Sequence, residues 1–97
     1  MYYVYILYSP SSGKTYTGFS NDIRRRVTEH NATEAKGFTL RYRPWELIFT
    51  ECFETKQEAM SRENFFKSGQ GREKIKSIIK DYLNERQVRY PPEAEKD

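Results

Sequence analysis

The stretch YYVYILY at residues 2–8 restricts the possible folds more than any other feature of this 97-residue chain. Every side chain in it is apolar or aromatic, and no charged residue interrupts it. A strand with one face in water alternates between apolar and polar residues, whereas an unbroken run is typical of a strand buried on both faces. We therefore expect residues 2–8 to form the central strand of a sheet.

The first half of the chain predicts a hairpin followed by a helix. The turn-forming SPSSG at 9–13 should connect residues 2–8 to a second strand at 14–19. Ser20, Asn21 or Asp22 can cap a helix that reaches about residue 31. Residues 32–44 are rich in Arg and Tyr, and we expect them to form a loop.

The second half predicts one more strand and two more helices. WELIFTECF at 45–53 should be a strand, with Cys52 in the core. Thr55 and Glu58 have the spacing of a capping box, so a helix should run to about Ser68, where Gly69 and Gly71 break it. A last helix carries one apolar stripe, made of Ile75, Ile78, Ile79, Tyr82 and Leu83. The predicted fold is a small α/β (α+β) sandwich in the order ββαβαα, with a three-stranded, mostly antiparallel sheet.

Length and composition favour a single domain at residues 1–83 with a loose tail at 84–97, where Pro91 and Pro92 end regular structure. A net charge of +3 and a pI near 9.0 permit a polyanionic partner. One cysteine excludes an intramolecular disulfide, and no apolar segment approaches the ~20 residues of a membrane span. The N-terminus lacks the basic flank of a signal peptide, so we expect a soluble cytoplasmic protein without membrane contact.

Three consecutive arginines in the first helix should differ in their surroundings. At about 100° per residue, Arg26 falls beside the apolar stripe and His30 lies one turn later on the same side. Arg25 faces away, and Arg24 lies on the far flank. Arg26 either extends over the edge of the core, which periodicity alone favours, or has a role of its own.

Glu63 is the residue that fits its predicted surroundings least well. On a helical wheel it falls in the apolar face, beside Ala59 and on the same side as Phe66. A charge buried in such a place costs several kcal/mol unless it is paired or bound to a metal. One interpretation is an ion pair with an arginine, or a face that opens to solvent; the other is a metal ligand or catalytic carboxylate. Tyr5 and Tyr16, on the two hairpin strands, can likewise be packing partners or site residues.

Taken together, these features resemble a known family. The ordered set is YVY at 3–5, YTG at 16–18, Arg26 and Glu63. It is similar to the GIY-YIG nuclease domain over about residues 2–80. The segments RPWEL at 43–47 and EAMSRENFFKSGQGRE at 58–73 resemble the single-domain UPF0213-type branch, which is related to the N-terminal domain of the excision-repair nuclease C subunit.

The resemblance implies a role for each matching residue. Tyr5 and Tyr16 match the catalytic tyrosines, Arg26 the catalytic arginine and Glu63 the metal-binding glutamate. Gly18 matches the glycine that lets the backbone come close at the site, and His30 fits a histidine found in part of the family. The implied cofactor is a divalent ion, Mg²⁺ with Mn²⁺ as the alternative. We expect the catalytic and metal residues to converge on one concave face of the sheet.

Departures from the family pattern concern the grip on substrate more than the chemistry. Tyr3 replaces the first motif's glycine, Thr17 a β-branched aliphatic residue, and Phe19 a lysine of the repair nucleases. Phosphate contacts are expected from five basic residues, Arg24, Arg25, Lys67, Arg72 and Lys74.

The main hypothesis is a metal-dependent endonuclease acting on DNA in repair or recombination, with a protein partner that supplies specificity. The alternative is a nucleic-acid-binding module with little or no cleavage activity. A purely structural role is a third hypothesis, which leaves Glu63 unexplained.

Overall fold

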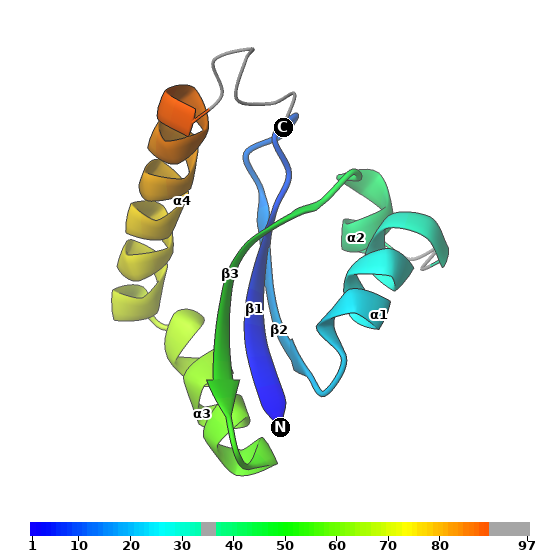
Figure 1. Ribbon diagram of the computed structural model, residues 1–97, viewed down its shortest axis with the longest axis vertical. Helices are drawn as coiled ribbons and strands as arrows, with labels where there is room; N and C mark the ends of the chain where they lie inside the picture. The colour runs from blue at the N-terminus through cyan, green and yellow to red at the C-terminus, as the bar shows by residue number, and fades with distance from the viewer. Residues whose placement is uncertain (34–36, 90–97) are drawn as a thin grey trace.

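A three-stranded antiparallel sheet forms the centre of the protein (Figure 1). The computed structural model describes residues 1–33 and 37–89. The strands are β1 (Tyr2–Tyr8), β2 (Thr15–Ser20) and β3 (Glu46–Phe53), in the spatial order β2-β1-β3. The four residues Val4 to Leu7 are at most 1% exposed. The expectation that the first apolar run forms a central strand is confirmed.

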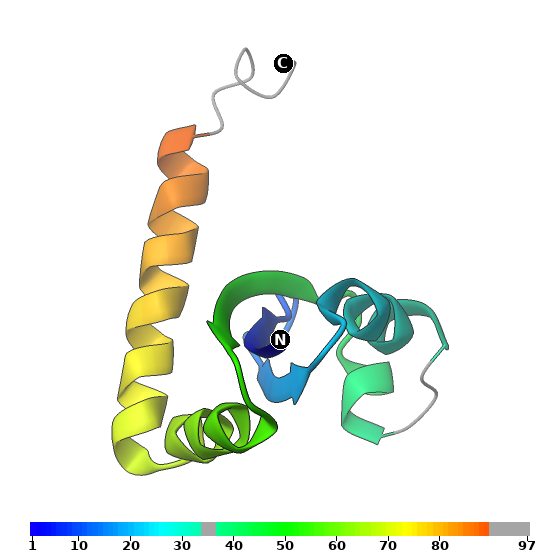
Figure 2. The ribbon, with the colours of Figure 1, turned by 60° about the horizontal axis from the view of Figure 1, so that its bottom comes forward.

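Helices cover both faces of this sheet, as Figures 1 and 2 show. On one side lie α1 (Ile23–Thr28), the π-helical turn η1 (Glu29–Thr33) and the short helix α2 (Gly37–Arg41). On the other side lie α3 (Lys56–Phe66) and α4 (Gly69–Arg89). The α+β class and the order of the main elements agree with the prediction.

The alternation of side chains along β1 divides the core into two clusters. Val4 and Ile6 pack with Ala59 and Phe66 of α3 and with Ile75 of α4. Tyr5 and Leu7 point to the opposite face, since successive strand residues do so. There they pack with Trp45, and Tyr16, Ile23, Val27 and Tyr42 lie against them. The two faces of the sheet therefore have different partners, and only one of them carries the predicted tyrosines.

Both predicted helix caps are present. The Asp22 carboxylate accepts a hydrogen bond from the backbone N–H of Arg25 at 3.1 Å, which satisfies one of the open donors at the start of α1. Thr55 and Glu58 form the reciprocal capping box at the start of α3. These short polar motifs fix the starts of two helices.

The structure corrects four expectations. The predicted loop at 32–44 contains α2, although residues 34–36 lie outside the described part of the chain. The glycines at 69 and 71 do not separate two helices but open α4. Helix α4 continues to Arg89, so the expected loose tail is wrong for residues 84–89, and residues 90–97 lie outside the described part. Cys52 is exposed, because it lies on the same face of β3 as the exposed Thr50, while Phe53 on the opposite face packs against the core.

Gly71 has a packing role at the junction of α3 and α4. A Cβ atom there would lie 1.9 Å from the carbonyl oxygen of Phe65 and 2.4 Å from the Cα of Phe66. Both are backbone atoms and cannot give way cheaply. The absence of a side chain therefore allows α4 to begin directly against the end of α3.

Within residues 1–33 and 37–89, no helix has the length and apolar character that crossing a membrane requires.

Candidate active site

A glycine on β2 makes room for the hydroxyl of Tyr5. Tyr5 and Gly18 are paired across β1 and β2. A Cβ atom at position 18 would lie 2.7 Å from the Tyr5 Oη atom and 2.9 Å from its Cζ atom, which is closer than real Cβ contacts. The Tyr5 ring therefore lies over the backbone of β2 at Gly18, where the absence of a side chain leaves room for it. The Tyr16 ring stacks beside it, with the ring centroids 6.3 Å apart.

A completely buried histidine lies against both tyrosines. His30 belongs to η1 and is 0% exposed. Its Nε2 atom is 3.1 Å from the Tyr5 hydroxyl oxygen, and the Tyr16 ring centroid is 4.5 Å from that of the imidazole. The face of the sheet that α1 covers thus brings together three of the predicted site residues, Tyr5, Tyr16 and His30.

Residues just before β3 hold His30 in place. The side chain of Arg43 donates from Nε to the carbonyl oxygen of His30 at 2.8 Å. Asn31 accepts from the backbone N–H of Trp45 at 2.6 Å and donates to the Trp45 carbonyl oxygen at 3.0 Å. These contacts tie the η1 turn to the segment RPWEL. In the sequence this segment indicates only the branch of the family, whereas in the structure it positions His30.

Arg26 approaches the same nitrogen of His30. Its Nη2 atom lies 3.4 Å from His30 Nε2. A guanidinium group only donates, so Nε2 must present a lone pair rather than a proton. The Tyr5 hydroxyl is then the donor in its bond to His30. In that tautomer Nε2 accepts from both Tyr5 and Arg26, and the imidazole proton is on Nδ1.

Glu29 is a site residue that sequence reasoning missed. Its carboxylate accepts from Arg26 Nη1 at 2.6 Å and from Arg25 Nη1 at 3.0 Å. The hydrogen bond from Arg26 is the largest cause that lowers the pKa of the Glu29 carboxyl below its usual 4.5. The signal was available, because residues three and four apart on a helix are neighbours.

The three arginines differ as the helical wheel predicted. Arg24 and Arg25 are exposed, while the side chain of Arg26 is only 27% exposed. Arg25 is also 3.8 Å from Asp22, in addition to its contact with Glu29. Arg26 alone joins the buried tyrosine–histidine cluster.

Glu63 lies apart from that cluster. It stands beside the buried Ala59 and on the same side as Phe66, as predicted, but its side chain is 18% exposed and accepts from Lys67 Nζ at 3.3 Å. Its surroundings match the interpretation of a face that opens to solvent, with Lys67 rather than an arginine as the partner. Because the helix that carries Glu63 packs on the other face of the sheet, the expected convergence of Glu63 with Tyr5 and His30 on one face is wrong. The role of Glu63 as a metal ligand stays a prediction.

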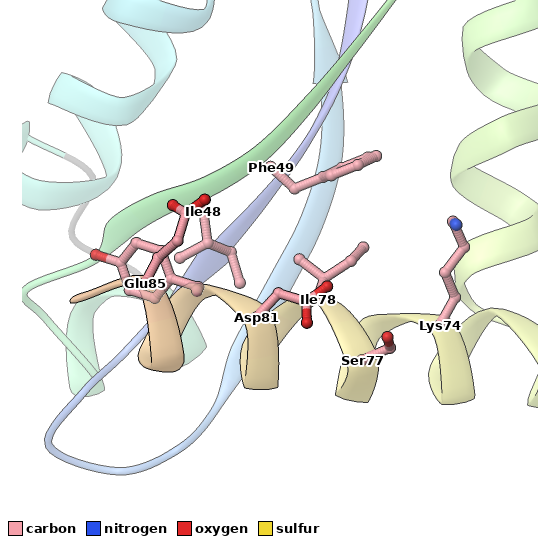
Figure 3. Close-up of a pocket in the computed structure, with 8 residues that line it drawn as sticks. Ile48, Phe49, Lys74, Ser77, Ile78, Asp81 and Glu85 are labelled. Carbon is pink, nitrogen blue, oxygen red and sulfur yellow. The ribbon is translucent and has the colours of Figure 1, made fainter. Parts of the chain in front are cut away.

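The predicted phosphate-binding residues of α3 and α4 line two different cavities. Lys67 and Arg72 line a hollow of about 310 Å³ that Tyr16 of β2 also lines. Lys74 lines a different groove of about 350 Å³ between α4 and β3 (Figure 3). Position along the sequence did not indicate this division.

In the described residues, no group of three or more His, Cys, Asp or Glu side chains could hold a metal. A single carboxylate is nevertheless an adequate protein contribution for Mg²⁺, which keeps several waters and takes its remaining ligands from substrate phosphates. Glu63 fits an ion that assembles with its substrate, and it does not fit a preformed protein cage.

The chain is similar to a known catalytic domain and to proteins of several organisms. The model of the GIY-YIG catalytic domain matches residues 1–76. A UPF0213 protein of Haloquadratum walsbyi is 45% identical over 67 residues, which cover 69% of this chain and 74% of that protein. A UPF0213 protein of Streptococcus agalactiae is 37% identical over 83 residues, or 86% and 92% of the two chains. The solution NMR structure of a Bacillus halodurans UPF0213 protein is 34% identical, with a TM-score of 0.48 over 80% of this chain and 85% of that one.

Proposed function

Because the chain belongs to the GIY-YIG family, we propose that it is an endonuclease that hydrolyses phosphodiester bonds in DNA with a divalent metal ion, in repair or recombination. The observation that carries the proposal is the approach of Tyr5 and Arg26 to one nitrogen of the buried His30. This arrangement combines a hydroxyl, a base and a fixed cation within one cluster. Phosphoryl transfer needs these functions more than it needs covalent chemistry.

The Tyr5–His30 contact supplies a route for a proton. A free tyrosine has a pKa near ~10 and is a poor base at neutral pH. The neutral imidazole at 3.1 Å can take the hydroxyl proton as Tyr5 receives one from the attacking water. His30 therefore supports a role for Tyr5 as the group that accepts a proton from the attacking water.

Arg26 is the group that meets the phosphate. In the structure its guanidinium binds the Glu29 carboxylate at 2.6 Å, so it is already oriented toward an anion. A phosphate competes with that carboxylate for the same planar donor group. Its hydrogen bonds become stronger as negative charge develops on the phosphate oxygens, which lowers the barrier.

Burial determines which groups the substrate reaches first. Tyr5 and His30 are at most 1% exposed, whereas Arg26 and Tyr16 are half-buried. Arg26 and Tyr16 therefore make the first contacts with the strand. The Tyr5 hydroxyl is buried, so its contact with the attacking water would require a movement of the side chains that cover it.

Glu63 would hold the divalent ion, which supplies positive charge to the phosphate and to the leaving oxygen when bound. The side chain is on α3, and α3 packs against both β1 and β2. At the open edge of β2, one phosphate could contact both the ion held by Glu63 on α3 and the guanidinium of Arg26 on α1. In that position the carboxylate must exchange Lys67 for the ion.

A nicking assay tests the proposal. Supercoiled, branched and single-stranded DNA are incubated with Mg²⁺, and with a chelator as control. We expect metal-dependent cleavage that Tyr5→Phe and Arg26→Ala abolish and that Arg24→Ala largely keeps. Absence of cleavage on all three substrates, or cleavage that survives both site substitutions, would contradict it.

A second function, nucleic-acid binding without appreciable cleavage, is favoured by two observations. The Glu29 carboxylate neutralises Arg26, and the Tyr5 hydroxyl is buried. If the strand never displaces Glu29, the protein binds phosphate through its exposed arginines alone. Binding in the same assay without nicking would support this function instead.

A further inference from the structure

The open edge of β2 carries a hollow whose exposed guanidinium, Arg72, has no role in the proposed chemistry. β2 pairs with β1 on one side only, so its other side is an edge of the sheet. The hollow of about 310 Å³ lies there, between β2, the end of α3 and the start of α4. Its lining residues are Thr15, Tyr16, Thr17, Phe66, Lys67, Arg72 and Ile75.

The charged groups in this hollow are both cationic. Lys67 comes from the end of α3 and Arg72 from the first turns of α4. Lys67 is paired with Glu63, whereas among the described residues Arg72 makes no ion pair. An exposed guanidinium beside the threonines of β2 is suited to a phosphate group, since both provide hydrogen-bond donors.

The second cavity differs in sign and serves as an internal comparison. Lys74 lines it together with the acids Asp81 and Glu85, and Ile48 and Phe49 of β3 form its apolar side (Figure 3). Two carboxylates oppose one ammonium there, so an anionic strand gains little. Although Arg72 and Lys74 are close in sequence, they face different electrostatic surroundings, so the phosphate contact that the sequence suggested for Lys74 is not retained.

We propose that the hollow at the β2 edge binds a phosphate of the nucleic-acid strand next to the one that is cut. Arg72 and Lys67 are the binding cations. Tyr16 connects the two places, because its ring is 4.5 Å from His30 and it also lines the hollow. The strand then crosses the edge of β2 from Arg26 on α1 to Arg72 on α4. The location next to the cut phosphate rests on the proposed nuclease function, while binding itself does not.

Lys67 links the hollow to the proposed metal ligand. Its ammonium is 3.3 Å from Glu63, one turn away on α3. A phosphate in the hollow attracts Lys67 away from Glu63 and leaves that carboxylate available for a cation. Binding of the strand therefore prepares the carboxylate, which agrees with a metal that assembles with its substrate.

Binding without cleavage tests the subsite. Fluorescence anisotropy follows a labelled single-stranded oligonucleotide in chelator, so that no metal-dependent cutting occurs, at several salt concentrations. We expect Arg72→Ala to weaken binding about 3–10-fold and to reduce the salt slope by about one contact. The matched control is Lys74→Ala, which removes the same charge from the same helix and should change affinity less than twofold. Thr17→Glu, which adds a carboxylate to the hollow, should weaken binding further.

The outcomes separate the subsite from the nuclease. Equal losses for Arg72→Ala and Lys74→Ala, or no loss for Thr17→Glu in a folded variant, would overturn the subsite even if the wild type cuts DNA. A selective loss for Arg72→Ala supports the subsite even if the wild type cuts nothing. Circular dichroism of each variant checks that the fold is kept.

Discussion

The two faces of the sheet use the same strand for different purposes. On the α3 side, β1 contributes Val4 and Ile6 to a cluster of apolar side chains. On the α1 side it contributes Tyr5, whose hydroxyl is bonded to a buried histidine. The α3 face is stabilised by the burial of apolar side chains. The α1 face combines such packing with hydrogen bonds between titratable groups.

This difference shows how a small domain can hold buried polar groups. A buried imidazole and hydroxyl are costly unless they are bonded to each other. The apolar face supplies the stability that lets the α1 face keep such groups. Substitutions on the two faces should therefore fail in different ways, and the following predictions test that contrast from the largest effect to the smallest.

Phe66→Ala should be the most damaging substitution for stability. Phe66 is 1% exposed and packs edge-on against Phe49, with the ring centroids 5.7 Å apart. Truncating it leaves a cavity and should cost about 3–5 kcal/mol of unfolding free energy. Urea denaturation measures the loss. A cost below about 1 kcal/mol would mean that the α3 face is not the main source of stability.

Arg26→Ala should greatly lower activity while the fold is kept. Loss of a cation that stabilises developing charge typically lowers turnover by about 10²–10³, or roughly 3–4 kcal/mol of barrier. Arg25→Ala and Arg24→Ala are the matched controls, since both side chains are exposed. They should weaken binding modestly and in a salt-dependent way. Cleavage rates and melting curves of all three variants test this difference. If the three variants behave alike, Arg26 has no special role.

Gly18→Ala should lower both stability and cleavage activity to an intermediate degree. The added Cβ would meet Tyr5 Oη at 2.7 Å and Tyr16 Cε1 at 3.2 Å. Overpacking of this kind costs about 1–3 kcal/mol, and it moves the Tyr5 hydroxyl away from His30. Thermal melts and cleavage rates should fall together. A variant as active as the wild type would show that the position of Tyr5 is not critical.

Glu63→Gln should leave stability almost unchanged and abolish metal-dependent cleavage. The partner ammonium of Lys67 is 58% exposed, so solvent screens the pair and its loss should cost no more than about 1 kcal/mol. An amide is a much weaker ligand for a hard divalent ion. Calorimetry and nicking assays test the two halves of this prediction. Undiminished cleavage would exclude Glu63 as the metal ligand.

The smallest effect should be a dependence of stability on acid pH through Glu29. Its pKa is lowered below the usual 4.5 in the folded state, chiefly by the bond from Arg26. A lowered pKa means that the contribution is fully present above about pH 4.5 and is lost as pH falls through the folded-state value. The stability difference between the wild type and Glu29→Gln should therefore shrink below that pH. Denaturant midpoints across the acid range test it, and a constant difference would contradict the assignment.

The sequence by itself determined the local elements. The apolar run identified the central strand, the polar motifs located the starts of α1 and α3, and the helical period indicated which side of α1 carries Arg26. It also placed Glu63 on the same side of its helix as two buried residues. These features depend on neighbours within about one turn or one hairpin, so periodicity encodes them.

Only the tertiary structure decided which groups meet. Periodicity tells which side of a helix is covered but not which face of the sheet covers it, so the separation of Glu63 from His30 was not predictable. The bond between Tyr5 and His30 joins β1 to η1, and the hollow at the β2 edge joins three elements. Such contacts arise when layers pack, because packing brings together residues that are distant in sequence and have no common local pattern.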